Sequence, residues 1–302
     1  MSRIIDDILS LNLIQADFII LSNYFTTKAD PQSNVSRASN DFEYIRLWYE
    51  SVRRNNLYAV VFHDALEREF IDNYQTDKII FIKCRLGRMS LNDERFFIFR
   101  EFLEVVNNNC FLLTTDINDV VINKSPFDFI SKHPEKIFLG RDEFYSWRSF
   151  SWSLSKLLEF RNRSNIKIPS DFLLSPIFNA GLIGGHVNTL KGLFDRMNVV
   201  LSKIGDSGNY NMALLNWVVF SNYTSFPRLN LVRRLPFFAF WKINNSILHG
   251  QLHFMKSCFR GQVIREEEGI VNTSNIYSGF PFCSLFKQYQ TQEDTVAYLI
   301  HK

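Results

Sequence analysis

Apolar and polar positions along the chain change in a regular order that predicts strands and helices in turn. Segments with apolar residues at helical spacing predict helices, two of them capped by Asn40 and Ser90, at 40–54, 64–74, 90–106, 143–161, 187–203 and 209–220. Short apolar runs predict strands at 17–25, 57–63, 78–83, 110–115 and 136–139. This alternation predicts an α/β fold with a mostly parallel central sheet, right-handed crossovers and flanking helices.

The most apolar predicted strand, 110–115, leads directly into two acids, Asp116 and Asp119. In open α/β sheets ligands bind at the carboxyl ends of the strands, so these acids are candidate site residues. Two neighbouring carboxylates repel each other unless a cation or hydrogen-bond donors compensate them. They can also simply cap the following turn, as Asp often does.

A second candidate segment is rich in small residues and runs from Ser175 to His186. Ala180, Gly181, Gly184 and Gly185 would let the backbone approach a ligand or adopt positive φ angles. The spacing is not the GxGxxG of a dinucleotide site. An ordinary tight turn before the helix at 187–203 is the alternative.

Basic side chains and histidines supply further candidates. Arg95 and Arg100 are the nearest cations before Asp116 and can face the pocket or lie solvated on the surface. His249 can join the acids around a divalent ion, or be structural. Segment 228–242 interleaves cations with aromatic residues, which suits either an anionic membrane interface or a strand buried under a loop.

Composition narrows the class of protein further. The chain has 302 residues and a formal charge of only +3, which argues against wholesale nucleic-acid binding. Its four cysteines form no CxxC pair, so neither zinc nor a disulfide framework is predicted. The amino terminus lacks the features of a signal peptide, and no apolar run is long enough to span a bilayer. We therefore expect a cytoplasmic protein.

Five segments in this order resemble the GT-A class of nucleotide-sugar-dependent glycosyltransferases, in particular bacterial surface-polysaccharide and lipopolysaccharide transferases. The resemblance implies a GT-A, Rossmann-like sheet with a carboxyl-terminal extension. The segments that carry it are Asn92-Asp93-Glu94-Arg95-Phe96, Thr115-Asp116-Ile117-Asn118-Asp119-Val120-Val121, Ser125-Pro126-Phe127, Asn179-Ala180-Gly181-Leu182-Ile183-Gly184-Gly185 and Asn211-Met212-Ala213.

The resemblance also implies roles for individual residues. The acidic motif would hold Mn²⁺ or Mg²⁺ on the diphosphate of the sugar nucleotide, which gives Asp116, Asp119 and His249 as candidate metal ligands. The candidate catalytic residues are Asp116, Asp119 and Asn211. The candidate donor-binding residues are Arg95, Asp116, Asn179, Ala180, Gly181, Gly184 and Lys287.

Three positions depart from the pattern of the class. Asn118 stands at the usual second acid, Asn211 replaces an aspartate, and Lys287 replaces a histidine. A lysine near the diphosphate can supply part of a cation's charge, so these departures bear on whether a metal is required.

We therefore predict a single GT-A domain over 1–302, with a nucleotide-sugar-binding core at 1–225 and an extension at 226–302. It would move a sugar from a UDP- or GDP-sugar to a glycan or lipid-linked saccharide, at the cytoplasmic face of the membrane, in surface polysaccharide synthesis. Two other functions stay open. One is a metal-dependent nucleotidyltransferase or phosphohydrolase, and the other is a non-catalytic carbohydrate-binding protein.

Overall fold

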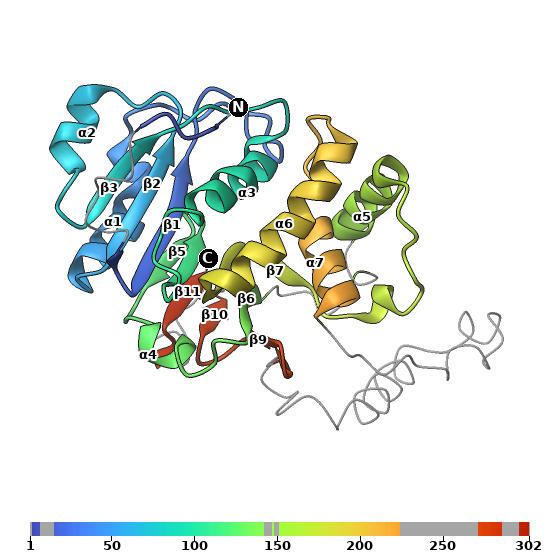
Figure 1. Cartoon of the computed structure of the whole chain (residues 1–302). Helices are drawn as coiled ribbons and strands as arrows, with labels where there is room; N and C mark the ends of the chain where they lie inside the picture. Colours follow the sequence, from blue (N-terminus) through green and yellow to red (C-terminus); the bar gives the residue numbers. More distant parts are fainter. Residues whose placement is uncertain are drawn as a thin grey trace.

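The computed structural model describes residues 2–6, 15–141, 147, 151–223, 271–285 and 296–301. Its centre is a sheet with helices on both faces (Figure 1). The strands are β1 (Phe18–Tyr24), β2 (Tyr58–His63), β3 (Ile79–Lys83), β4 (Phe111–Thr115), β5 (Val120–Ile122), β6 (Ile137–Arg141), β7 (Phe178–His186), β8 (Val271–Asn272), β9 (Ile276–Ser278), β10 (Cys283–Leu285) and β11 (Leu299–His301). The helices are α1 (Phe42–Arg54), α2 (Arg68–Tyr74), α3 (Leu91–Phe102), α4 (Phe127–Ile130), α5 (Ser151–Ser164), α6 (Val187–Ile204) and α7 (Asn211–Asn222).

The main sheet has eight strands in the order β3-β2-β1-β4-β7-β6-β9-β8. Four of its seven pairings are parallel, and the pairings of β4 with β7, β6 with β7 and β8 with β9 are antiparallel. The predicted α/β fold with a mostly parallel sheet is therefore confirmed. The βαβ units from β1 to β4 bring the carboxyl ends of β1, β2 and β4 to one edge, where ligands bind in such sheets.

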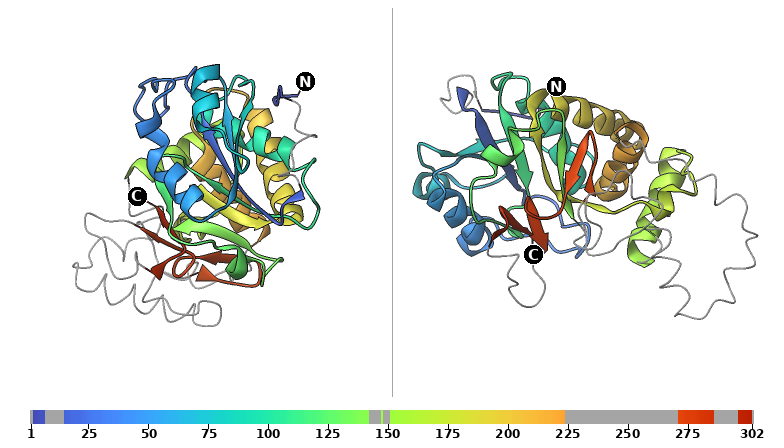
Figure 2. Two further views of the ribbon diagram at one scale, coloured as in Figure 1. Left: turned by 90° about the vertical axis from the view of Figure 1, so that its left-hand side faces the viewer. Right: turned by 90° about the horizontal axis from the view of Figure 1, so that it is seen from below.

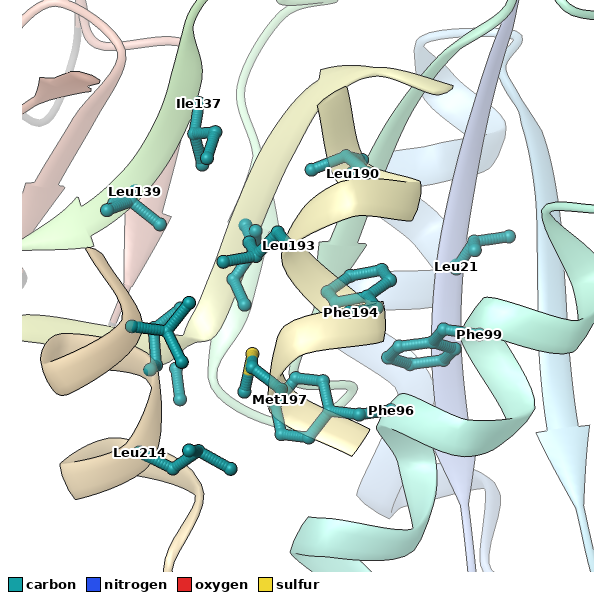
Figure 3. Packing of buried hydrophobic residues seen from close by; sticks show 14 of the residues in the cluster. Leu21, Phe96, Phe99, Ile137, Leu139, Leu190, Leu193, Phe194, Met197 and Leu214 are labelled. Atoms are coloured by element: carbon teal, nitrogen blue, oxygen red, sulfur yellow. The ribbon is translucent and has the colours of Figure 1, made fainter. Parts of the chain in front are cut away.

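Each face of the sheet is covered by its own apolar layer. On β1, Ile19 and Leu21 face the cluster beneath α3, α6 and α7, whereas Phe18 and Ile20 face the cluster beneath α1 and α2. This alternation follows from the two-residue period of a strand. Figure 2 shows helices on the two sides of the sheet, and Figure 3 shows the first layer, in which Phe194 of α6 lies beside Phe99 of α3.

Most of the segment at 175–186 is the strand β7, which neither the ligand-approach interpretation nor the alternative of a tight turn had predicted. Strand β7 has nine residues, and the five at 182–186 pair antiparallel with β4, with Gly184 opposite Leu113 and Gly185 opposite Leu112. Local composition gives no signal for a strand here, since glycine is usually unfavourable inside strands. Here the glycines fit a crowded sheet interior, where a Cβ at Gly184 would lie 3.1 Å from Leu113 Cδ1.

Two helix starts also differ from the prediction. The N-cap of α1 is Asp41, which accepts a hydrogen bond from Glu43 N, while Asn40 adopts a left-handed conformation with φ 61°. Helix α2 begins at Arg68 instead of Asp64, because the Asp64 carboxylate accepts hydrogen bonds from Thr26 N and Thr27 N. The predicted cap of α3 at Ser90 is confirmed.

A smaller sheet, in the order β10-β11-β5, stands beside the turn that follows β4. Strand β11 pairs antiparallel with β5, which places His301 opposite Val120. Figure 1 shows the carboxyl terminus beside these strands. The described residues of the expected extension at 226–302 thus contribute strands to both sheets. None of the helices in the described ranges is long and apolar enough to cross a membrane.

Candidate metal centre

The turn between β4 and β5 presents Asp116 and Asp119 at the carboxyl edge of the sheet. All five residues of β4 are buried, and its last residue, Thr115, is fixed from two sides. Trp48 Nε1 of α1 donates a 2.8 Å hydrogen bond to Thr115 Oγ1, and Ser22 Oγ of β1 donates to the Thr115 carbonyl over 2.8 Å. The backbone that delivers the first acid is therefore held by both neighbouring elements.

Arg95 of α3 pairs directly with Asp116. Its Nη1 lies 2.5 Å from Asp116 Oδ1, and its Nη2 donates to the Ala180 carbonyl over 2.9 Å. Burial disfavours the charge of Asp116, but the positive charges of Arg95 and Arg37, together with the hydrogen bond from Arg95, outweigh the effect of burial, and the pKa of Asp116 is lowered. Asp116 is therefore ionised at neutral pH.

The Asn179–Gly181 segment of β7 forms the other wall. The Asp116 amide donates to the Gly181 carbonyl over 2.8 Å, and Asn179 Oδ1 accepts from the Gly181 amide over 2.7 Å. A Cβ at position 181 would overlap Asp116 Oδ2. Glycine is required here for close approach to the carboxylate, so the segment and the first acid are built as one unit.

His301 completes the cluster from the smaller sheet. Asp116, Asp119 and His301 each offer a ligand atom, and these atoms lie within 4.8 Å of one another. The His301 side chain is buried, with 4% of the residue exposed, and its Nδ1 has no hydrogen-bond partner among the described residues. A buried ring nitrogen without a partner costs free energy that a bound cation can offset.

This donor set fits a divalent cation. Two carboxylate oxygens and an imidazole nitrogen are the ligands that suit Mn²⁺, and carboxylates also suit Mg²⁺. Two acids close together repel each other, and a dication between them removes that cost. The side chain of Asp116 is 29% exposed, so an ion can reach it from solvent.

Five residues predicted from the sequence thus lie together with Asp119: Arg95, Asp116, Asn179, Ala180 and Gly181. Gly184 instead faces Leu113 inside the sheet. Asn211 lies at the start of α7, where its Nδ2 donates to Asn209 Oδ1. His249, Lys287 and the basic-aromatic segment 228–242 lie outside the described residues.

His301 was missed by the sequence analysis, which considered His249 as the metal-ligating histidine. A weak signal existed, because His301 directly follows the apolar residues Leu299 and Ile300, as Asp116 follows its own strand. A three-residue strand carries too little periodicity to be predicted by itself. The pairing of β11 with β5 is a contact between distant parts of the chain, so spacing could not place His301 beside the acids.

Comparison with known proteins gives similarity to glycosyltransferases at the level of structure only. No protein-family model matches the chain, and no curated protein matches it. Among solved structures, the galactosyltransferase LgtC in complex with donor and acceptor sugar analogues is 13% identical, with a TM-score of 0.40. An active-site mutant of LgtC is 12% identical, with a TM-score of 0.42. Each comparison covers 67% of this chain and 70% of that chain.

At such identities and TM-scores, residue roles and substrates do not transfer from LgtC. The function is therefore argued from the residues around Asp116.

Proposed function

We propose that this chain is a metal-dependent glycosyltransferase that moves a sugar from a nucleotide-diphosphate sugar to a glycan or lipid-linked saccharide. The observation that supports it best is the convergence of Asp116, Asp119 and His301, whose ligand atoms lie within 4.8 Å of one another at the carboxyl edge of the sheet. Sugar transfer from such a donor releases a nucleoside diphosphate, and negative charge develops on that leaving group. A divalent cation supplies the compensating charge when bound.

Each residue around the centre has a distinct part in this proposal. Asp116, Asp119 and His301 would hold the ion, and Arg95 keeps Asp116 ionised and fixes one of its carboxylate oxygens. Gly181 leaves the space in which the Asp116 carboxylate lies, and the Asn179 side chain fixes the Gly181 amide. The donor sugar would lie against the Asn179–Gly181 wall, since this backbone directly adjoins the ion-binding acid.

The donor set favours this function over a two-ion nucleotidyltransferase or phosphohydrolase. Two-metal sites share several carboxylates between their ions. Within the described ranges, Asp116, Asp119 and His301 form one cluster with two carboxylates, which suits one ion. A non-catalytic sugar-binding protein would not need two acids with a buried imidazole beside them.

The same proposal covers features that lie beyond this centre. The chain acts as one catalytic domain over 1–302, in the cytoplasm, with a UDP- or GDP-sugar as donor. Segment 228–242 meets the membrane that carries the lipid-linked acceptor, because its cations and aromatic side chains suit an anionic lipid surface.

Release of nucleoside diphosphate from a panel of UDP- and GDP-sugars tests the proposal. We expect turnover with at least one donor in Mn²⁺ and its loss in EDTA. Asp119→Asn removes a ligand charge with little change of shape and should lower turnover at least about 100-fold, which is about 2.7 kcal/mol of barrier. Asp128→Asn, at an exposed acid of α4, is the matched control. Equal activity in EDTA would disprove the cation's role, and no turnover with any donor would disprove the transferase.

A further inference from the structure

Helix α1 runs along the turn that carries the two acids. Trp48 donates to Thr115, the residue before Asp116, and Ser51 Oγ accepts from Ile122 N in β5 over 3.1 Å. Tyr44 lies four residues before Trp48 and therefore on the same face of the helix, one turn closer to its amino terminus. This geometry places Tyr44 beside the metal centre.

The Tyr44 hydroxyl is an unused hydrogen-bonding group. It is buried and has no partner among the residues that the structure describes. Burial raises the pKa of Tyr44, and the negative charges of Asp116 and Asp119 raise it further, against the opposing charge of Arg37. The phenol therefore keeps its proton at neutral pH and can donate a hydrogen bond to a ligand.

Arg37 lies over the ring of Tyr44, with its Cζ 4.9 Å from the ring centroid. Its Nη2 pairs with Asp30 Oδ2 at 2.9 Å. The loop that carries Arg37 is tied to the end of β1, because Tyr24 Oη donates to the Ala38 carbonyl over 2.6 Å. The guanidinium is thus held in a built position near the acids, where its charge contributes to the lowered pKa of Asp116.

We propose that the Tyr44 hydroxyl and the Arg37 guanidinium form an anion-binding flank of the metal centre, which takes oxygens of the donor's diphosphate. This inference rests on the proposed function. A cation held by Asp116, Asp119 and His301 would compensate only part of the charge of a diphosphate, and the other diphosphate oxygens would need hydrogen-bond donors. Arginine and a buried hydroxyl make strong charge-assisted hydrogen bonds to phosphate oxygens. Without a ligand, a buried hydroxyl that makes no hydrogen bond lowers the stability of the folded protein.

The same helix offers a matched control pair. Arg53 Cζ lies 5.7 Å from the ring of Tyr49, as Arg37 lies over Tyr44. Here the tyrosine hydroxyl already has a partner, since it donates to the Tyr74 carbonyl over 2.7 Å. Tyr49 and Arg53 therefore report what loss of a hydroxyl or a guanidinium on α1 does to the fold alone.

Calorimetric titration with inorganic pyrophosphate and with UDP, both in saturating Mn²⁺, tests the flank. We expect Tyr44→Phe and Arg37→Gln each to weaken both ligands by about tenfold or more, the usual effect of losing one hydrogen bond to a charged group. Tyr49→Phe and Arg53→Gln should leave both affinities within about twofold. Affinity for Mn²⁺ alone should not fall in any of the four variants.

The outcomes separate the flank from the proposed function. If the parent binds pyrophosphate and UDP, and Tyr44→Phe and Arg37→Gln bind them equally well, the flank is wrong while the transferase stands. If these variants lose Mn²⁺ affinity as well, Tyr44 and Arg37 support the cation site and not the anion, which also overturns the inference. If the parent binds Mn²⁺ but neither diphosphate, the proposed function fails and the flank fails with it.

Discussion

Asp93 and Asp116 are two acids in apolar surroundings, and their partners differ. Asp93 lies under the junction of α3 and α7, where its carboxylate accepts from Ser90 Oγ over 2.8 Å and from Tyr210 N over 3.2 Å. Burial raises its pKa to about 7, although these hydrogen bonds oppose the shift. Asp116 is partly exposed, and the charge of Arg95 lowers its pKa in spite of burial. Asp93 joins α3 to α7 through hydrogen bonds, whereas Asp116 is kept ionised at the carboxyl edge of the sheet.

The polar groups around the two acids also differ in how many of their hydrogen bonds are made within the protein. Next to the helix junction, Asn216 uses both ends of its amide, since Oδ1 accepts from Phe178 N and Nδ2 donates to the Phe178 carbonyl. Around the acidic turn, Arg95 Nε, Tyr44 Oη and His301 Nδ1 are buried without a partner in the described part of the chain. Each such atom costs about 1–3 kcal/mol unless a ligand satisfies it. Both ends of the Asn216 amide are thus satisfied within the fold, whereas three polar atoms around the acidic turn are left for a ligand to satisfy.

The largest expected loss of stability comes from removing Arg95, which pairs with Asp116. Arg95→Met leaves the Asp116 charge and the Ala180 carbonyl without their partner, and should cost about 3 kcal/mol of unfolding free energy in urea. Arg100→Met, on the same helix, removes only exposed pairs with Glu104 and Asp195 and should cost less than about 1 kcal/mol. Equal losses in the two variants would show that Asp116 does not depend on Arg95.

The next effect is a pH dependence that belongs to Asp93 alone. Folded Asp93 binds its proton more tightly than the unfolded chain does, so this acid makes the parent less stable as pH rises from about 4 to about 7. The slope approaches about 1.4 kcal/mol per pH unit for one proton. Asp93→Asn should match the parent near pH 4 and become relatively more stable as pH rises.

Urea unfolding of the parent and of Asp93→Asn at each pH measures this difference. Other titrating groups, such as buried His63, whose pKa is lowered to about 4, cancel between the two proteins. A difference in unfolding free energy that stays constant with pH would show that Asp93 is ionised throughout, as Asp116 is.

The smallest expected effects come from adding a methyl group at two glycines of β7, Gly181 and Gly184. A methyl at position 181 meets the Asp116 carboxylate, so Gly181→Ala should weaken Mn²⁺ binding about tenfold, or about 1.4 kcal/mol. A methyl at position 184 meets Leu113 in the core, so Gly184→Ala should cost about 1 kcal/mol of stability and leave Mn²⁺ affinity unchanged. If Gly184→Ala also weakened Mn²⁺ binding, the donor-binding role predicted for Gly184 would regain support.

The sequence predicted those parts of the fold that local patterns determine. Alternating apolar runs predict β1 to β4 and β6, and Ser90 predicts the start of α3. The strand β7 was missed, because its glycines are explained by contacts with β4 and not by local preference. The sequence did not decide whether Arg95 faces the pocket or the solvent, since helical spacing alone does not show which neighbour a long side chain contacts. Its pairing with Asp116 depends on how α3 packs against β4.

The most direct test of the central claim, that Asp116, Asp119 and His301 hold one divalent ion, is electron spin-echo spectroscopy of bound Mn²⁺. This measurement detects a nitrogen ligand through its nuclear modulation. The account predicts nitrogen modulation in the parent, its loss in His301→Ala, and its retention in His249→Ala, the histidine favoured by sequence alone. Modulation that persists in His301→Ala, or a parent that binds no Mn²⁺, would contradict the account.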